Sequence, residues 1–325
     1  MDDGFKERAA AADPEMGNLS SLLLMLVHEP SPELFRAVMD FTRFAYWQQP
    51  TVTVACALLP HLDEHLDWKA HCLHVIGNIQ MRLSQYRTAV ESVTTAAQLN
   101  LETNDLSSAA RCKRMAGDLH RILGEVDRAE SLLIDAYEMY AALNDELGEA
   151  RCRRDIDALM LESQELGAAV KHLTAARQTF ERIGDGFGVA QCSELLGTVS
   201  LFRRDLESAS TELEASRAAF ADFGDMFHQA QSTRVLSSIL RTQGEWTRAE
   251  RLLNEAEDLF KDSRNQEGLA ACAWEFGRLR IDQGRQEEAI AYFESATNLY
   301  VALGLDRNAE ECREMQGRLQ SAVQV

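Results

Sequence analysis

The cysteines are the residues of this chain whose type and spacing first suggest chemistry. Six of the seven have sequence numbers that differ by multiples of forty: Cys72, Cys112, Cys152, Cys192, Cys272 and Cys312. The one missing slot in this series holds Ser232. Thiolates bind zinc and form disulfides, so a regular row of thiols could be a metal or redox site.

The regular spacing argues against both chemistries. Equivalent positions in neighbouring units of a stacked helical array lie roughly 8–10 Å apart. A disulfide needs Cα atoms about 4.4–6.8 Å apart, and zinc ligands converge to about 2.3 Å from the ion. Free cysteine packs as a small hydrophobe. We therefore predict that these cysteines are buried packing residues, and that Cys56 is too, because it precedes Ala96 by one full period in a second column of small residues.

Residues 61–74 (HLDEHLDWKAHCLH) hold four of the eight histidines and are the other candidate for chemistry. His61 and His65 are spaced i,i+4 and could share one face of a helix. The stretch crosses an expected helix boundary, however, and His71 and His74 lie on a different face from Cys72. We expect solvated or locally hydrogen-bonded histidines, with a metal-dependent enzyme using this cluster as a remote alternative. The chain has no GxxxxGK[ST], GxGxxG, HExxH or GxSxG motif, so we expect no catalytic residues, cofactor or metal.

The cysteine spacing belongs to an internal repeat with a period of forty. With Ala70 as position 1, position 20 is always alanine: Ala89, Ala129, Ala169, Ala209, Ala249 and Ala289. Position 24 is large and apolar: Val93, Leu133, Leu173, Leu213, Leu253 and Phe293. Position 31 is aromatic in five units: Tyr140, Phe180, Phe220, Phe260 and Tyr300. Position 8 is mostly glycine: Gly77, Gly117, Gly197, Gly277 and Gly317. Repetition of this kind is typical of solenoid proteins.

Each unit is predicted to form two helices. Positions 3, 7 and 10 recur at helical spacing in the first half, and positions 20, 24, 27 and 31 in the second. Turns are expected at Gly124, Gly244 and Gly284, and helix ends at Asn144-Asp145 and Gly184-Asp185. One hairpin cannot bury both of its faces, so neighbouring hairpins must stack. The predicted fold is an all-α solenoid of stacked antiparallel helix pairs.

The spacing of the small residues resembles the tetratricopeptide repeat (TPR) over roughly residues 70–308. The period departs from the usual one of about 34 residues, and we expect the surplus to lie after the second helix. The phrases AQCSELLG and ARCKRMAGDLHRILGEVDRAESLL resemble the carboxy-terminal arrays of fungal STAND proteins, which carry NACHT or NB-ARC modules. The resemblance implies a right-handed TPR-like superhelix and a non-catalytic binding scaffold.

The repeats predict four segments of the chain. Residues 1–17 are expected to be disordered, and residues 18–69 to form helices that include a degenerate capping repeat. Within that segment, Pro32 is expected to open a helix to about Trp47, and Pro50 another to about His65, which Pro60 could kink. Residues 70–308 form six repeats, and residues 309–325 form a capping helix with a largely polar surface. The aromatic residues of 31–69 either close the core or pack on a domain outside this chain.

The composition limits the possible partners and location. The formal net charge is −19, which disfavours nucleic acids and anionic membranes. Residues 1–20 lack a secretory pattern, and the apolar run LLLMLV is too short to cross a bilayer. We therefore expect a soluble cytoplasmic protein with reduced thiols.

By the TPR resemblance, positions 2, 5, 9 and 12 of the first helices face a concave groove. These positions supply the expected partner-binding residues: Arg111, Arg114, Arg121, Arg151, Arg154, Arg234, Arg241 and Trp274. Arginine pairs bidentately with carboxylates and phosphates, which favours an acidic or phosphorylated peptide as the ligand. The alternative is that the arginines pair with carboxylates of the chain itself. A chaperone-tail clamp fits less well, since Met115 and Asp155 occupy slots where that pattern wants asparagine and a basic residue.

The sequence thus predicts a non-catalytic scaffold that binds a protein or peptide segment in its groove. The fungal resemblance favours a sensor arm of a STAND protein. The alternative is a stand-alone, peptide-responsive regulatory switch.

Overall fold

The computed structural model describes residues 17–48, 51–162 and 166–323, and in these ranges it contains helices and turns but no strand. The described helices form two compact units, Met1–Glu149 and Ala150–Val325, which are treated separately below. The all-α prediction is confirmed, and within each unit consecutive helices pack on one another as in a TPR-like solenoid.

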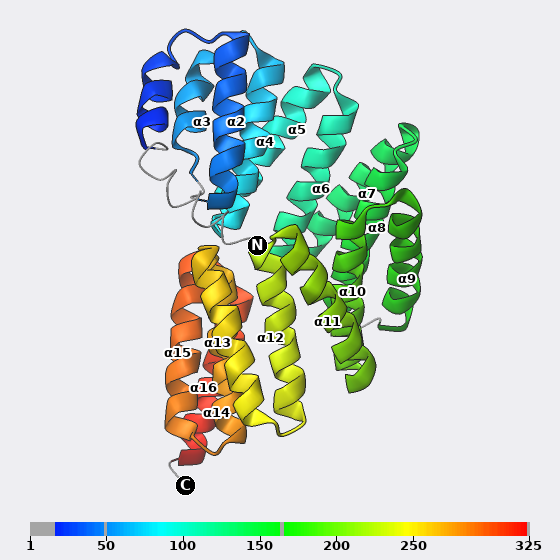
Figure 1. Ribbon diagram of the computed structural model, residues 1–325, viewed down its shortest axis with the longest axis vertical. Coiled ribbons are helices and arrows are strands. Elements are labelled where there is room, and N and C mark those ends of the chain that lie inside the picture. The colour runs from blue at the N-terminus through cyan, green and yellow to red at the C-terminus, as the bar shows by residue number, and fades with distance from the viewer. Residues whose placement is uncertain (1–16, 49–50, 163–165, 324–325) are drawn as a thin grey trace. The chain divides into compact units, whose positions relative to one another are not determined.

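The first unit contains an amino-terminal group of helices followed by the first repeats (Figure 1). Residues 17–26 are helical. The elements that follow are α2 (Pro32–Gln48), α3 (Thr53–Leu58), the 3₁₀ helix η1 (Leu59–His61), α4 (Leu66–Arg82), α5 (Tyr86–Glu102), α6 (Leu106–Ile122), α7 (Val126–Ala142) and the start of α8 (Glu146–Glu162). The helices from α4 to α7 each pack on the next one in sequence.

The helix predicted from Pro50 to about His65 is wrong. In its place are the six-residue α3, the 3₁₀ helix η1, and a turn that leads into α4. Pro60 lies within η1 and has no backbone N–H, so it cannot continue the α-helical hydrogen bonding. Pro50 itself lies outside the described residues.

The amino-terminal helices share one hydrophobic core, in which Val38, Phe41, Leu58 and Leu62 are buried. Phe35 packs at the edge of this core. The side chains of Phe44, Tyr46 and Trp47 lie outside the described residues, and so do residues 1–16 of the segment predicted to be disordered. Gly17, the last residue of that segment, is helical.

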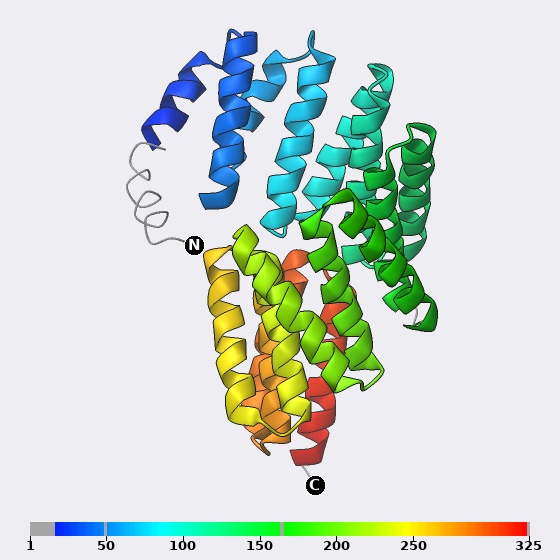
Figure 2. The same cartoon turned by 45° about the vertical axis from the view of Figure 1, so that its right-hand side comes forward.

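The second unit begins in α8 and continues through the later repeats to the carboxy-terminal helix. Its further helices are α9 (Leu166–Ile183), α10 (Gly186–Phe202), α11 (Leu206–Phe223), α12 (Met226–Thr242), α13 (Trp246–Asp262), α14 (Gln266–Asp282), α15 (Gln286–Leu303) and α16 (Asp306–Val323). Figures 1 and 2 show α12 to α15 side by side. The first helices of adjacent repeats also touch, α10 with α12 and α12 with α14.

Two or three residues join successive repeat helices, and one residue of each described connection adopts the left-handed conformation. In the expected turns this residue is Gly124, Gly244 or Gly284, with φ of 75°, 79° and 74°. The next residue caps the following helix where it is aspartate, as when Asp105 accepts a hydrogen bond from the Ser108 N–H at 3.0 Å. The connections are too short to hold the surplus over the usual TPR period. The extra residues therefore lie in the helices, contrary to the expectation that they follow the second helix.

Glycine at repeat position 8 makes room for the large side chain at position 24. A Cβ added to Gly77 would lie 2.4 Å from Val93 Cγ1, and one added to Gly277 would lie 2.8 Å from the Phe293 ring. Both distances are far below ordinary van der Waals contact. The small residue at position 8 and the large residue at position 24 therefore face each other in the contact between the two helices of a repeat.

The regularly spaced cysteines are buried, as predicted, and none is more than 1% exposed. They are free thiols. Burial raises the pKa of Cys72 and of Cys272 to about 12, so both thiols stay protonated at neutral pH. The prediction for Cys56 is wrong: it is exposed, because α3 buries Val54, Ala55 and Leu58 on its other face.

Among the described helices, none combines the length and the apolar character that crossing a lipid bilayer requires.

Candidate functional site

The first repeat lacks an aromatic ring at the contact between the end of its second helix and the start of the next first helix. In three other repeats this contact joins an aromatic ring to Gly148, Gly188 or Gly268. In the remaining two repeats the glycine position holds His228 or Asn308. A Cβ added to Gly148 would lie 2.2 Å from the Tyr140 ring, and one added to Gly268 would lie 2.2 Å from the Phe260 ring. The ring therefore occupies the space that a side chain would need. In the first repeat the two positions hold Asn100 and Ser108 instead.

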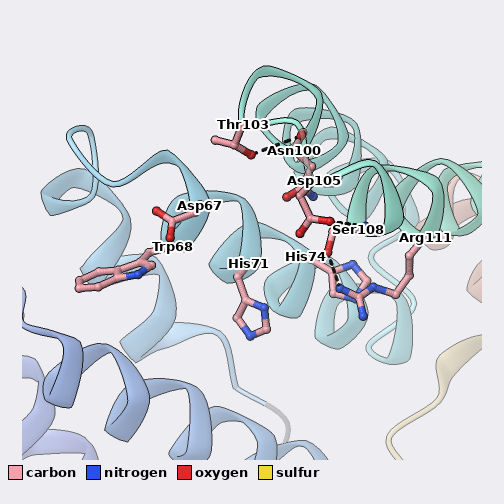
Figure 3. Close-up of a pocket in the computed structure, with 9 residues that line it drawn as sticks. All are labelled: Asp67, Trp68, His71, His74, Asn100, Thr103, Asp105, Ser108 and Arg111. Carbon is pink, nitrogen blue, oxygen red and sulfur yellow. Dashed lines mark hydrogen bonds between the residues drawn. The ribbon is translucent and has the colours of Figure 1, made fainter. Parts of the chain in front are cut away.

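A pocket of about 210 Å³ lies at this position in the first unit (Figure 3). Helix α4 contributes Asp67, Trp68, His71 and His74 to its lining. The end of α5 and the start of α6 contribute Asn100, Thr103, Asp105, Ser108 and Arg111. Asn100 is only 5% exposed, and its amide nitrogen lies 3.7 Å from Cys112 Sγ. Asparagine is shorter than the aromatic residue found in the other repeats, so it leaves the pocket unfilled.

The two histidines of the pocket are neutral at physiological pH. Burial, followed by the charges of Arg111, His71 and Arg114, lowers the pKa of His74 to about 3. Burial and the charges of Arg111 and Arg43 also lower the pKa of His71. His74 Nε2 lies 3.0 Å from the Asn78 amide nitrogen, and its Nδ1 lies 3.5 Å from Cys112 Sγ. A neutral imidazole that accepts from Asn78 and donates from Nδ1 to the sulfur satisfies both contacts.

Arg111 is the predicted partner-binding arginine that lines this pocket. It is exposed, and its Nη2 donates a hydrogen bond to Ser108 Oγ at 3.1 Å. Among the described residues, its guanidinium forms no ion pair, although the Asp105 carboxylate lies near enough to feel its charge. Arg114 is half-buried on the same helix. Arg121 donates to Asp118 of its own helix at 2.8 Å.

In the second unit, the predicted arginines pair with carboxylates of the chain. Arg151 donates to Asp185 at 3.0 Å, which links α8 to the cap of α10. Arg154 is 8% exposed, bonds Asp155 at 2.5 Å and also contacts the Gln191 side chain. These contacts favour the alternative interpretation of the second-unit arginines, namely that they hold neighbouring repeats together.

The later repeats of the second unit follow the same pattern. Arg241 lies 2.5 Å from Asp282 and 3.8 Å from Glu275, and Arg234 lies 3.9 Å from Glu275. Trp274 packs edge-on against Phe293, with ring centroids 5.1 Å apart. A partner-binding role for these residues remains a prediction.

The histidines of residues 61–74 are dispersed. His61 contacts His28 at 3.2 Å, His65 stacks on Trp68, and His71 and His74 line the pocket. Within the described parts of the chain, no group of three or more His, Cys, Asp or Glu side chains is arranged to hold a metal ion.

Sequence reasoning missed a second polar site, centred on His228. This residue occupies the position that is Gly148, Gly188 or Gly268 in other repeats, and its ring stacks on Phe220 with centroids 4.6 Å apart. Burial lowers the pKa of His228, but its contact with Glu194 at 2.9 Å outweighs that effect, so the pKa is raised overall. A histidine in a glycine column, like an asparagine in an aromatic column, was the signal that could have revealed these sites.

Comparisons with known proteins agree with this fold. Residues 228–300 match the family model described as tetratricopeptide repeat. A search of curated proteins found no match. Among solved structures, the chain is similar to a Rap protein complexed with Competence and Sporulation Factor, with a TM-score of 0.63 and 11% identity over 97% of this chain and 98% of that one.

Two further solved structures share the fold. The Rap conjugation gene regulator of plasmid pLS20, solved in complex with a Phr peptide, has a TM-score of 0.61 and 12% identity over 95% of this chain and 97% of that one. A STAND protein with a tetratricopeptide repeat sensor from Pyrococcus horikoshii has a TM-score of 0.52 and 13% identity over 94% of this chain and 52% of that one. Residues 228–300 thus match the tetratricopeptide repeat by sequence, and the described residues have a TPR-like repeat fold.

Proposed function

We propose that the chain is a non-catalytic protein-interaction scaffold that binds an acidic peptide segment of a partner at the pocket of the first unit. The observation that carries this proposal is the state of Arg111. Its guanidinium lines a pocket and bonds a neutral hydroxyl, whereas Arg121, Arg151, Arg154 and Arg241 are paired with carboxylates.

The local charge suits an acidic ligand. Arg43, Arg111 and Arg114 all lie near enough to depress the pKa of a pocket histidine, which puts three guanidinium charges around the site. Asp67 and Asp105 are the acidic residues of the lining. A carboxylate or phosphate bound to Arg111 would form an ion pair that can be bidentate, which is stronger than the present single hydrogen bond to the neutral hydroxyl of Ser108.

The solved relatives support a peptide or protein partner. Both Rap structures described above are complexes, one with Competence and Sporulation Factor and one with a Phr peptide. Their identity to this chain is 11% and 12%, so they suggest the type of ligand and not its sequence. The STAND relative keeps the sensor-arm interpretation as a second candidate, in which the same binding event would report to a nucleotide-binding module on another segment or chain.

The proposal is tested by capturing partner proteins from an extract of the source cells on the immobilised chain. Overlapping synthetic peptides from each captured protein are then tested for binding. The wild type is compared with Arg111→Glu and with the matched control Arg128→Glu. Arg128 lies in the same unit but outside the pocket, is exposed, and pairs with Glu125. We expect Arg111→Glu to abolish binding of an acidic peptide and the control to preserve it. Equal binding by all three folded proteins would reject the proposal.

A further inference from the structure

The replacement of an aromatic residue by Asn100 points to what the pocket accommodates. In other repeats the corresponding ring is buried: Phe180 and Phe260 are 0% exposed, and Tyr140 is 5% exposed. Each ring closes the space between its own helix and the glycine that begins the next one. In the first repeat Asn100 and Ser108 fill only part of that space, and the pocket is what remains.

The pocket is of a size that suits one side chain. Its volume of about 210 Å³ lies below the roughly 300–1,000 Å³ that is usual for sites of drug-sized ligands. The lining also contains a polar side chain with unused bonding capacity. Asn100 is only 5% exposed, and its side-chain oxygen Oδ1 accepts no hydrogen bond from the described residues, whereas its main-chain oxygen accepts from Asp105 and Thr103. A ligand that enters the pocket can therefore satisfy this group.

One wall of the pocket is aromatic. Trp68 stacks on Phe35, with ring centroids 5.0 Å apart, and on His65, with centroids 4.4 Å apart. Both rings stack on the indole of Trp68, which also lines the pocket. Aromatic rings pack well against one another in offset-stacked and edge-to-face arrangements. The neutral imidazoles of His71 and His74 add two further flat, uncharged surfaces.

We propose that the pocket binds an aromatic side chain of a partner segment, which takes over the space that a ring of the chain itself fills in the other repeats. The adjacent acidic group of the same segment binds Arg111. The binding of an acidic group to Arg111 rests on the proposed function. The binding of an aromatic side chain rests on the presence of Asn100 and Ser108 where other repeats have an aromatic ring and a glycine. A tyrosine is the best fit, because its hydroxyl can donate a hydrogen bond to the Asn100 side-chain oxygen.

The test uses three capped pentapeptides as probes: Glu-Glu-Tyr-Glu-Glu, Glu-Glu-Ala-Glu-Glu and Ala-Ala-Tyr-Ala-Ala. Their affinities are measured by titration calorimetry, or by ligand-observed NMR where binding is weak. The first key variant, Asn100→Phe with Ser108→Gly, recreates the ring–glycine pair of Phe260 and Gly268. The glycine is needed because a Cβ at that position would collide with the ring, as the 2.2 Å approach at Gly268 shows. Ser108→Gly alone is the control that keeps the pocket open.

A second way of closing the pocket guards against misfolding of the double variant. Thr103 is exposed and lines the pocket, so Thr103→Trp should obstruct it from the solvent side without changing a buried residue. Circular dichroism and thermal melting confirm that each variant is folded.

We expect the tyrosine in the acidic peptide to strengthen wild-type binding about tenfold or more over alanine, an effect in the range of aromatic anchors at interfaces. The two pocket-closing variants should lose this preference, and Ser108→Gly should keep it. Equal binding of the tyrosine and alanine acidic peptides, both weakened by Arg111→Gln, would overturn the aromatic inference and leave the proposed function standing. A third outcome is that the neutral tyrosine peptide binds, that the two pocket-closing variants lose this binding, and that Arg111→Gln leaves it unchanged. This outcome would support the aromatic inference and overturn the acidic part of the proposed function. Failure of all three peptides to bind at millimolar concentration would overturn both.

Discussion

A comparison of Gly277→Ala with Gly317→Ala tests the packing rule of the repeat. The two glycines occupy the same repeat position, and both lie inside helices, α14 and α16. At Gly277 the new methyl group would lie 2.8 Å from two atoms of the Phe293 ring, which is 0% exposed and cannot move aside freely. At Gly317 nothing lies within 4 Å, because α16 is the last described helix and that face has no described partner.

The magnitude follows from separating two effects. Alanine stabilises a helix interior by about 1 kcal/mol relative to glycine, and both variants receive this gain. Overpacking of a filled core costs about 1–3 kcal/mol, and only Gly277→Ala incurs it. We therefore expect Gly317→Ala to stabilise by about 1 kcal/mol, and Gly277→Ala to be less stable than Gly317→Ala by about 1–3 kcal/mol.

Hydrogen exchange is the suitable assay, because long repeat arrays need not unfold in one step. Exchange of the α15 amides, followed by mass spectrometry, reports the local opening free energy next to both sites. We expect faster exchange in Gly277→Ala than in the wild type or Gly317→Ala. If the two variants slow exchange equally, contact with the position 24 side chain is not the reason why position 8 is small.

Three other predictions concern stability. First, the unfolded pKa of His74 is about 6.5 and its folded pKa is about 3, so the unfolded state takes up the proton first as the pH falls. The free energy of unfolding should therefore drop by about 2 kcal/mol between pH 7.5 and 5 through this group, and urea denaturation should show that His74→Asn lacks this part of the drop. Second, the Ser216 and Ser232 hydroxyls share a 2.9 Å hydrogen bond, and both residues are 0% exposed. Ser216→Ala alone should lower the free energy of unfolding by about 1–2 kcal/mol, and adding Ser232→Cys, the residue of the other repeats, should restore that stability. A double-mutant denaturation cycle with no coupling between the two positions would contradict this. Third, Arg154→Met should destabilise by about 3 kcal/mol and Arg151→Met by less than about 1 kcal/mol, because Arg154 is buried beside Asp155 whereas Arg151 is 41% exposed in its pair; similar urea midpoints for the two variants would refute the distinction.

The candidate site was only partly foreseeable from the sequence. Arg111 was identified because its position in the first helix recurs with the repeat. The pocket beside it was not, although Asn100 stands out in a column that is otherwise aromatic. Attention to where a repeat departs from its own pattern would have found both this position and His228. The volume of the pocket still depends on how the neighbouring rings of Trp68, His71 and His74 pack, and the repeat pattern of the sequence does not predict that packing.

What the sequence determined by itself is the repeat and its packing logic. The period, the buried thiols and the pairing of small with large repeat positions are local patterns that recur in most repeats, so they can be read without coordinates. The tertiary structure alone decided which arginines are paired. Arg151 meets Asp185 and Arg241 meets Asp282 across 34 and 41 residues of chain, and such contacts exist only once helices of adjacent repeats have stacked. It also decided that Cys56 faces solvent, because the short α3 does not continue the repeat register. Burial follows from periodicity, whereas ion pairing and cavities follow from the distances that stacking sets.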